Sequence, residues 1–152
     1  MRDVEPSSRM LDGIRVLDFT MFLAGPYCTR LMADLGAEVI KVEPPNGDFY
    51  RNAPPVRAGR SAQFGHFNCG KKSLSVDLKK AAGVDVILRL AADCDVFIEN
   101  FRPGVMGKLG LGYCALKSKA RCRLLFRFWL RTTGAERASS SLCAGGARAQ
   151  RQ

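Results

Sequence analysis

The sequence is poor in the residues that mark several common kinds of site. It has a single histidine, His66, and no two of its six cysteines have the C-x-x-C spacing of a zinc site or a redox motif. No apolar run approaches the ~18 residues that cross a bilayer. The first ten residues lack the apolar segment of a secretory signal. We therefore expect a cytoplasmic protein with no metal site and no membrane partner.

Positive charge is distributed unevenly along the chain. The formal net charge is +10, yet residues 117–152 contain nine of the 24 Lys and Arg residues and only one of the 14 Asp and Glu residues. Residues 121–152 also lack both the two-residue and the 3.6-residue apolar period. We therefore expect a flexible segment over 1–9, a folded segment over 10–116, and a basic tail over 117–152 that is disordered or translated out of frame. The nearly neutral main segment argues against a nucleic-acid partner.

Apolar periodicity up to about residue 113 predicts alternating strands and helices. Strands are predicted over residues 14–19, 38–42, 73–78 and 95–99, and helices over 29–35, 80–92 and, briefly, from Pro103 to Gly110. A loop rich in glycine, proline and arginine is predicted from Pro44 to about Gly65. This alternation indicates an α/β fold, in which a parallel sheet is built from Rossmann-like βαβ units.

Three segments that follow predicted strands are candidate ligand sites, because ligands of such folds bind beyond the carboxyl ends of the strands. The first precedes Pro26, where small residues let a ligand approach the backbone at a helix N-terminus; it matches neither G-x-G-x-x-G nor the P-loop. The second contains Lys71 and Lys72, which can pair with phosphates. The third combines an amide, an aromatic ring and cations: Asn100, Phe101, Arg102 and Lys108. Each segment is also open to a purely structural interpretation.

Ordered sequence blocks carry a resemblance to a known family. The blocks are D-G-I-R-V-L-D-F-T, A-G-P, D-L-G-A-E-V-I-K-V-E, N-C-G-K-K-S-L-S-V-D-L-K and D-V-F-I-E-N-F-R-P-G, followed by L-G-L-G-Y. From about Met10 to Tyr113 the chain resembles the N-terminal domain of the class III coenzyme A (CoA) transferases, and is thus expected to be part of such a domain. The resemblance implies CoA contacts at Phe22, Leu23, Ala24, Val76, Asp77, Leu78, Lys79, Asn100, Phe101, Arg102 and Lys108.

The family resemblance also implies a reaction, the transfer of CoA from an acyl-CoA to a carboxylic acid through an aspartate nucleophile. CoA is then a substrate, and no tightly bound cofactor is expected. The nucleophile of the family lies well beyond the matched blocks, and no aspartate follows Tyr113 in this sequence. We therefore expect no catalytic residue here. Family members form interlocked homodimers, which we do not expect of this chain.

Two further departures from the family leave alternatives open. Formyl-CoA transferases have an arginine where this chain has Pro44, and two alternatives follow: a phosphate or adenine contact is absent there, or Lys41, Arg51 or Arg57 supplies it. The tail is interpreted as the product of a frameshift near residues 115–125, with a naturally short paralogue as the alternative.

Three alternatives to a transferase remain open: a racemase of the α-methylacyl-CoA type, a CoA-binding module without turnover, and an inert product. Asp18 and Glu43, at strand ends, and His66 are interpreted as structural.

Overall fold

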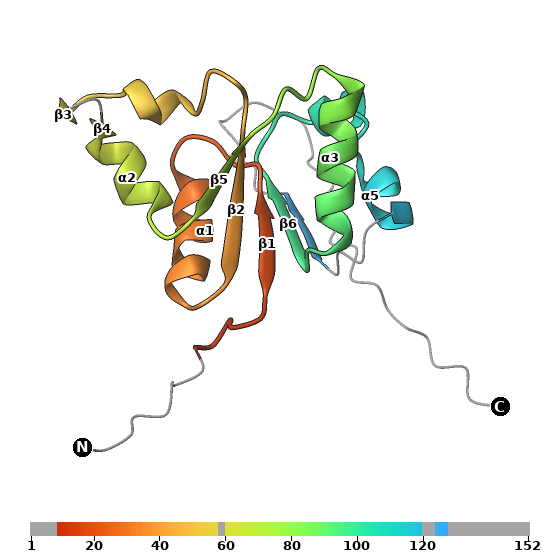
Figure 1. Ribbon diagram of the computed structural model, residues 1–152, viewed down its shortest axis with the longest axis horizontal. Coiled ribbons are helices and arrows are strands. Elements are labelled where there is room, and N and C mark those ends of the chain that lie inside the picture. Colours follow the sequence, from red (N-terminus) through yellow and green to blue (C-terminus); the bar gives the residue numbers. More distant parts are fainter. Residues whose placement is uncertain (1–8, 58–59, 120–123, 128–152) are drawn as a thin grey trace, which may run out of the picture.

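The computed structural model describes residues 9–57, 60–119 and 124–127 (Figure 1). Residues 1–8, 58–59, 120–123 and 128–152 lie outside it, and with them most of the predicted tail. The elements, in chain order, are β1 (Arg15–Asp18), α1 (Ala24–Asp34), β2 (Glu38–Glu43), the 3-10 helix η1 (Phe49–Asn52), β3 (Val56–Arg57), β4 (Arg60–Ser61), α2 (Ala62–Asn68), β5 (Lys72–Ser75), α3 (Ala81–Ala92), β6 (Val96–Glu99), α4 (Val105–Lys108), α5 (Tyr113–Lys119) and β7 (Leu124–Arg127).

Five parallel strands form the main sheet, in the order β5-β2-β1-β6-β7. The central strand β1 pairs with β2 and β6, and Leu17 lies opposite both Ile40 and Phe97. The chain leaves β1 toward β2 on one side and later returns to β6 on the other, so the strand order reverses between β1 and β6. The predicted α/β fold with Rossmann-like βαβ units is therefore confirmed.

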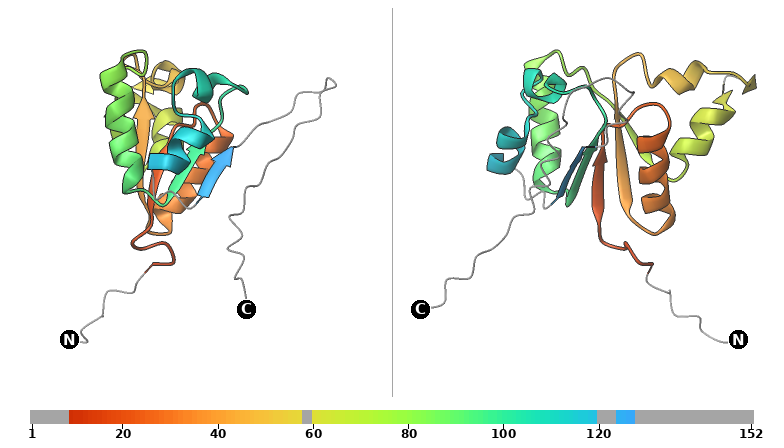
Figure 2. Two further views of the ribbon diagram at one scale, coloured as in Figure 1. Left: turned by 90° about the vertical axis from the view of Figure 1, so that its right-hand side faces the viewer. Right: turned by 180° about the vertical axis from the view of Figure 1, so that it is seen from behind.

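Helices cover both faces of this sheet. The crossovers from β1 to β2 and from β2 to β5 run in one direction across the sheet, whereas those from β5 to β6 and from β6 to β7 run in the other. Because such connections are right-handed, their helices lie on opposite faces of the sheet. Helices α1 and α2 pack together on one face, and α3 and α5 pack together on the other (Figure 2). The carboxyl ends of the strands form the upper edge of the sheet in Figure 1.

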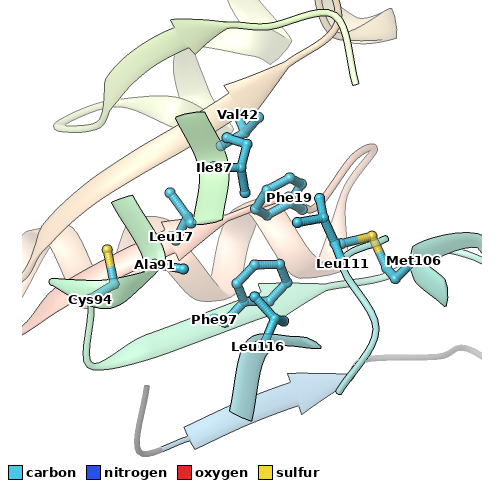
Figure 3. Close-up of a cluster of buried hydrophobic side chains, with 10 residues drawn as sticks. All are labelled: Leu17, Phe19, Val42, Ile87, Ala91, Cys94, Phe97, Met106, Leu111 and Leu116. Carbon is cyan, nitrogen blue, oxygen red and sulfur yellow. The ribbon is translucent and has the colours of Figure 1, made fainter. Parts of the chain in front are cut away.

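The larger of two apolar clusters lies between the sheet and α3 (Figure 3). At its centre the rings of Phe19 and Phe97 stack with their centroids 4.6 Å apart. The other cluster lies on the α1 side and includes Val16 and Ile98. Because the central strands are buried on both faces, their sequences are nearly continuous apolar runs rather than alternating ones.

Several elements differ from the sequence-based expectation. Helix α2 lies partly within the segment predicted as a loop, and the Ser61 hydroxyl caps its N-terminus by accepting from the Phe64 N–H at 3.3 Å. The strand expected over 73–78 ends at Ser75. Residues 117–119 belong to α5, and residues 124–127 form β7, which pairs with β6. These seven residues, assigned to the tail by composition, thus lie in two elements, α5 in contact with α3 and β7 paired with β6.

Candidate functional site at the carboxyl edge of the sheet

The turn between β1 and α1, residues 19–23, lies at the point where the strand order reverses. Phe22 has a φ of +69°, which is unusual for a residue other than glycine, and the residue is 54% exposed. Leu23 is also exposed, and Ala24 begins α1. A Cβ atom on Gly25 would lie 2.4 Å from the Thr20 Cβ. Glycine at position 25 therefore allows α1 to begin directly against this turn.

Asn100, at the end of β6, is hydrogen-bonded to this turn through both ends of its amide. Its Oδ1 accepts from the Met21 N–H at 2.9 Å, and its Nδ2 donates to the Met21 carbonyl at 2.7 Å. The predicted segments 22–24 and 100–102, almost 80 residues apart in the chain, are thereby brought together. Asn100 can still offer one further N–H and one lone pair to a ligand.

The other residues predicted after β6 differ in exposure. Phe101 is partly buried against the larger apolar cluster, and its N–H donates to the Glu99 carboxylate at 2.7 Å. Arg102 is exposed, and so is Lys108 at the end of α4. Buried Met106 anchors α4 to the same cluster (Figure 3). The segment after β6 therefore packs apolar side chains against the core and exposes two cations to solvent.

The predicted segment 76–79 follows β5, on the far side of β2 from β1. The Val76 N–H donates to the Glu43 carbonyl at 2.8 Å, and the side chains of Val76 and Leu78 pack against the larger apolar cluster. The Asp77 carboxylate accepts from the backbone N–H of Lys79 at 3.0 Å, and the Lys79 residue is exposed. This segment shares the sheet edge and the apolar cluster with Phe101, but no hydrogen bond joins it to the β1 turn in the described residues.

Lys71 and Lys72 do not have the positions expected of phosphate ligands. The Lys71 side chain is 1% exposed and its Nζ lies 3.0 Å from the Asp18 carboxylate. Lys72 is exposed, but its Nζ is paired with the Glu38 carboxylate at 2.5 Å. Glu38 is the first residue of β2 and lies away from the carboxyl edge of the sheet. The pattern of two adjacent lysines could not show this difference, because only the fold decides which side chain points inward.

Two of the three residues considered as replacements for an arginine at position 44, Lys41 and Arg51, are held by partners within the protein. Lys41 is buried, with its Nζ 2.8 Å from the Asp48 carboxylate. Arg51 donates to both carboxylate oxygens of Glu43 at 2.6 Å and lies over the Phe64 ring. Arg57 is exposed. Of the three, Arg57 alone is described with a side chain open to a ligand.

Asp18 and Glu43, which the sequence analysis interprets as structural, are both buried and hydrogen-bonded within the fold. Asp18 is fully buried and accepts from the N–H and hydroxyl of Thr20 and the hydroxyl of Thr29, at 2.6 to 2.8 Å. Burial raises the pKa of Glu43, but hydrogen bonds from Arg51, Ser73 and the Asp48 N–H outweigh that effect and lower it to about 2.

A row of aromatic rings beside the β1 turn was not predicted. Phe22 contacts Phe49 and Tyr50, at centroid distances of 5.8 and 6.3 Å, and Phe67 links Tyr50 to Tyr27. His66 stacks on Tyr27 and its Nδ1 lies 3.2 Å from Arg30 Nη1, which agrees with a structural role. The rings come from the β1 turn, α1, η1 and α2, so no local sequence pattern could reveal the row.

Other kinds of site receive no support from the described part of the chain. A pocket of about 320 Å³ lies at the opposite edge of the sheet, near Arg15, Glu38 and Asp95, and includes none of the predicted site residues. No group of three or more potential metal ligands occurs within residues 9–57, 60–119 and 124–127. Among the helices described, none is long and apolar enough to span a membrane.

The fold and the site define an α/β protein with a candidate ligand site at the switch point of a parallel sheet. Residues 11–123 match CoA-transferase family III, and the chain belongs to this family. The resemblance inferred from the sequence blocks is therefore confirmed.

Two curated relatives and one crystal structure illustrate the similarity. The chain is 49% identical over 109 residues to succinyl-CoA:glutarate CoA-transferase of Mus musculus, covering 70% of this chain and 25% of the relative. It is 49% identical over 115 residues to the probable fatty acyl-CoA transferase Rv3272 of Mycobacterium tuberculosis, covering 74% and 29%. A crystal structure of that organism's hypothetical protein Rv3272 matches with a TM-score of 0.76 at 43% identity, covering 84% of this chain and 36% of the other. The chain thus spans under a third of the length of these two relatives.

Proposed function

We propose that this chain binds the CoA moiety of an acyl-CoA at the carboxyl edge of its sheet, as the corresponding part of a CoA transferase does. The observation that carries the proposal is the pair of hydrogen bonds between Asn100 and the Met21 backbone, because it joins two of the predicted contact segments at the switch point. The names of the family and of its relatives support CoA as the ligand.

The exposed groups at this edge match the chemistry of CoA. Arg102, Lys108 and Lys79 are exposed cations that suit the phosphates, and the guanidinium of Arg102 can form two parallel hydrogen bonds to one of them. Phe22 and Leu23 offer exposed apolar surface to the less polar parts of the ligand. The remaining contacts in the proposal are Ala24, Val76, Asp77, Leu78, Asn100 and Phe101.

Binding and turnover are separate parts of the proposal. In the transfer reaction an aspartate carboxylate attacks the thioester carbonyl, the C–S bond breaks, and CoA leaves as a thiolate while a mixed anhydride forms. No aspartate follows Tyr113 in this sequence. We therefore propose that the chain binds CoA or acyl-CoA without transferring the acyl group to a carboxylic acid on its own.

Isothermal titration of the full chain with CoA tests the binding proposal. Wild type should bind, and the double variant Arg102→Ala/Lys108→Ala should bind at least tenfold more weakly, because hydrogen bonds to charged groups contribute about 1.5–3 kcal/mol each. Arg89→Ala is the control. Arg89 is an exposed cation in the last turn of α3, at the end of this helix that is farther from the predicted contact segment 76–79. No binding by wild type, or equal losses in variant and control, would contradict the proposal.

A turnover assay tests the second part. Succinyl-CoA and glutarate, the pair named for the mouse relative, are incubated with the full chain and the formation of glutaryl-CoA is followed. We expect none. Transfer above the rate without protein would show that the chain has a nucleophile that its sequence pattern does not reveal.

A further inference from the structure

Two lysines are buried beneath the turn that carries Phe22, Leu23 and Ala24. Lys41 lies on β2 and Lys71 directly precedes β5. Their side chains are only 2% and 1% exposed. Burying an ammonium group costs several kcal/mol unless it is paired and hydrogen-bonded, so two such groups in one place need an explanation.

The two ammonium groups donate to backbone carbonyls on either side of the contact segment. Lys41 Nζ donates to the Thr20 carbonyl at 2.8 Å, within the β1 turn. Lys71 Nζ donates to the Pro26 carbonyl at 2.8 Å, in the first turn of α1. Residues 21–25 lie between these two points, and the segment is therefore attached to the interior on both sides.

Each lysine has its own buried counter-ion. The Asp48 carboxylate lies 2.8 Å from Lys41, and the Asp18 carboxylate lies 3.0 Å from Lys71. Asn68 Oδ1 also accepts from Lys71, at 2.9 Å. Burial lowers the pKa of Lys71, and the charge of Asp18 opposes that shift. Both ammonium groups are thus neutralised by partners that are themselves enclosed by the fold.

We propose that Lys41 and Lys71 are positioning residues, which hold the backbone of residues 21–25 in the conformation that binds CoA. The role rests on the proposed function, since it assumes that this segment contacts CoA. An apolar side chain of similar length would fill the same space but would leave the two carbonyls without these donors. Phe22 and Leu23 are half exposed, and the ring contacts of Phe22 with Phe49 and Tyr50 do not supply donors to these two carbonyls.

The test removes one ammonium group together with its counter-ion. In Asp18→Asn/Lys71→Met no unpaired charge is left in the interior, and the new amide can still accept from Thr20 and donate to Thr29. The full chain is studied by ¹⁵N relaxation and by titration with CoA. Lys72→Met is the control, because Lys72 is adjacent in sequence but exposed.

We expect the amides of residues 21–24 to change from order parameters of about 0.85 in wild type to below ~0.6 in the double variant, with the sheet unchanged. The affinity for CoA should fall at least tenfold, and Lys72→Met should alter neither quantity. A general loss of stability would not confine the change to this turn. Unchanged order parameters at the turn, or a turn already mobile in wild type, would overturn the proposal.

The second lysine gives an independent variant, Lys41→Met/Asp48→Asn, with the same expected result. If both double variants fail to fold, the two lysines stabilise the whole domain and the positioning role is refuted. If wild type does not bind CoA, the proposed function fails, whereas the order parameters still decide whether the lysines hold the turn.

Discussion

Replacing Glu43 with glutamine tests how the end of β2 holds the loop that follows it. The Glu43 side chain is 2% exposed. Its Oε2 accepts from Arg51 Nε at 2.6 Å and from the Asp48 N–H at 3.0 Å. Its Oε1 accepts from Arg51 Nη2 at 2.6 Å and from the Ser73 hydroxyl at 2.7 Å. Glutamine keeps the shape of the side chain but loses the charge and presents an N–H₂ group to one of these donors.

The lowered pKa of Glu43 sets the size of the effect. A shift from 4.5 to about 2 corresponds to about 3 kcal/mol, at ~1.36 kcal/mol per pH unit. Arg51 is 40% exposed, so solvent screens part of its contribution and we expect about 2 kcal/mol. The unfolded chain binds this proton at higher pH than the folded chain does. The contribution is therefore complete above pH 4.5 and is lost as the pH falls toward about 2.

Urea denaturation followed by circular dichroism measures this contribution. The difference in free energy of unfolding between wild type and Glu43→Gln should be about 2 kcal/mol near pH ~7 and should shrink steadily between about pH 4.5 and pH 2. Glu38→Gln is the control on the same strand: its partners Arg15 and Lys72 are at least 40% exposed, so we expect less than ~1 kcal/mol. A difference for Glu43→Gln that does not change with pH would refute the reasoning.

Substitutions at three further positions test the β1 turn and its contacts. Gly25→Ala should lower the free energy of unfolding by about 2 kcal/mol, measured by urea denaturation, because its Cβ would overlap Thr20. Phe22→Gly should be about 1 kcal/mol more stable than Phe22→Ala by the same measurement, since only glycine adopts the positive φ without strain. Asn100→Asp should weaken CoA binding at least tenfold in a titration, because a carboxylate oxygen would face the Met21 carbonyl.

Each of these substitutions has a control elsewhere in the chain. A Cβ atom added at Gly107 in α4 would meet no other atom within 4 Å, so Gly107→Ala should not destabilise the protein. At Phe49, whose φ is not positive, alanine should be more stable than glycine, the reverse of the order expected at Phe22. Asn52 is exposed in η1, and Asn52→Asp should leave CoA binding unchanged. A variant that behaves like its control would show that the corresponding residue does not contribute to the turn in the way described.

Much of the fold could be predicted from sequence, because the central strands and α3 carry long apolar patterns that local physics interprets correctly. Helix α2 was missed because it is short and lies next to a segment rich in glycine and proline, although Ser61 is a recognisable N-cap residue. Strand β7 was missed because its four residues lie in a basic segment without periodicity, and its pairing with β6 depends on a strand almost 30 residues earlier.

The candidate site shows the same division. The sequence by itself determined the family, the parallel α/β fold and the segments at the strand ends, since these depend on ordered local patterns. Only the tertiary structure decided that Lys71 is buried against Asp18, 53 residues away, while Lys72 faces solvent. It likewise decided that Asn100 bonds the Met21 backbone. Charge and hydrogen-bonding capacity are properties of a residue, but their partners are chosen by packing between distant segments.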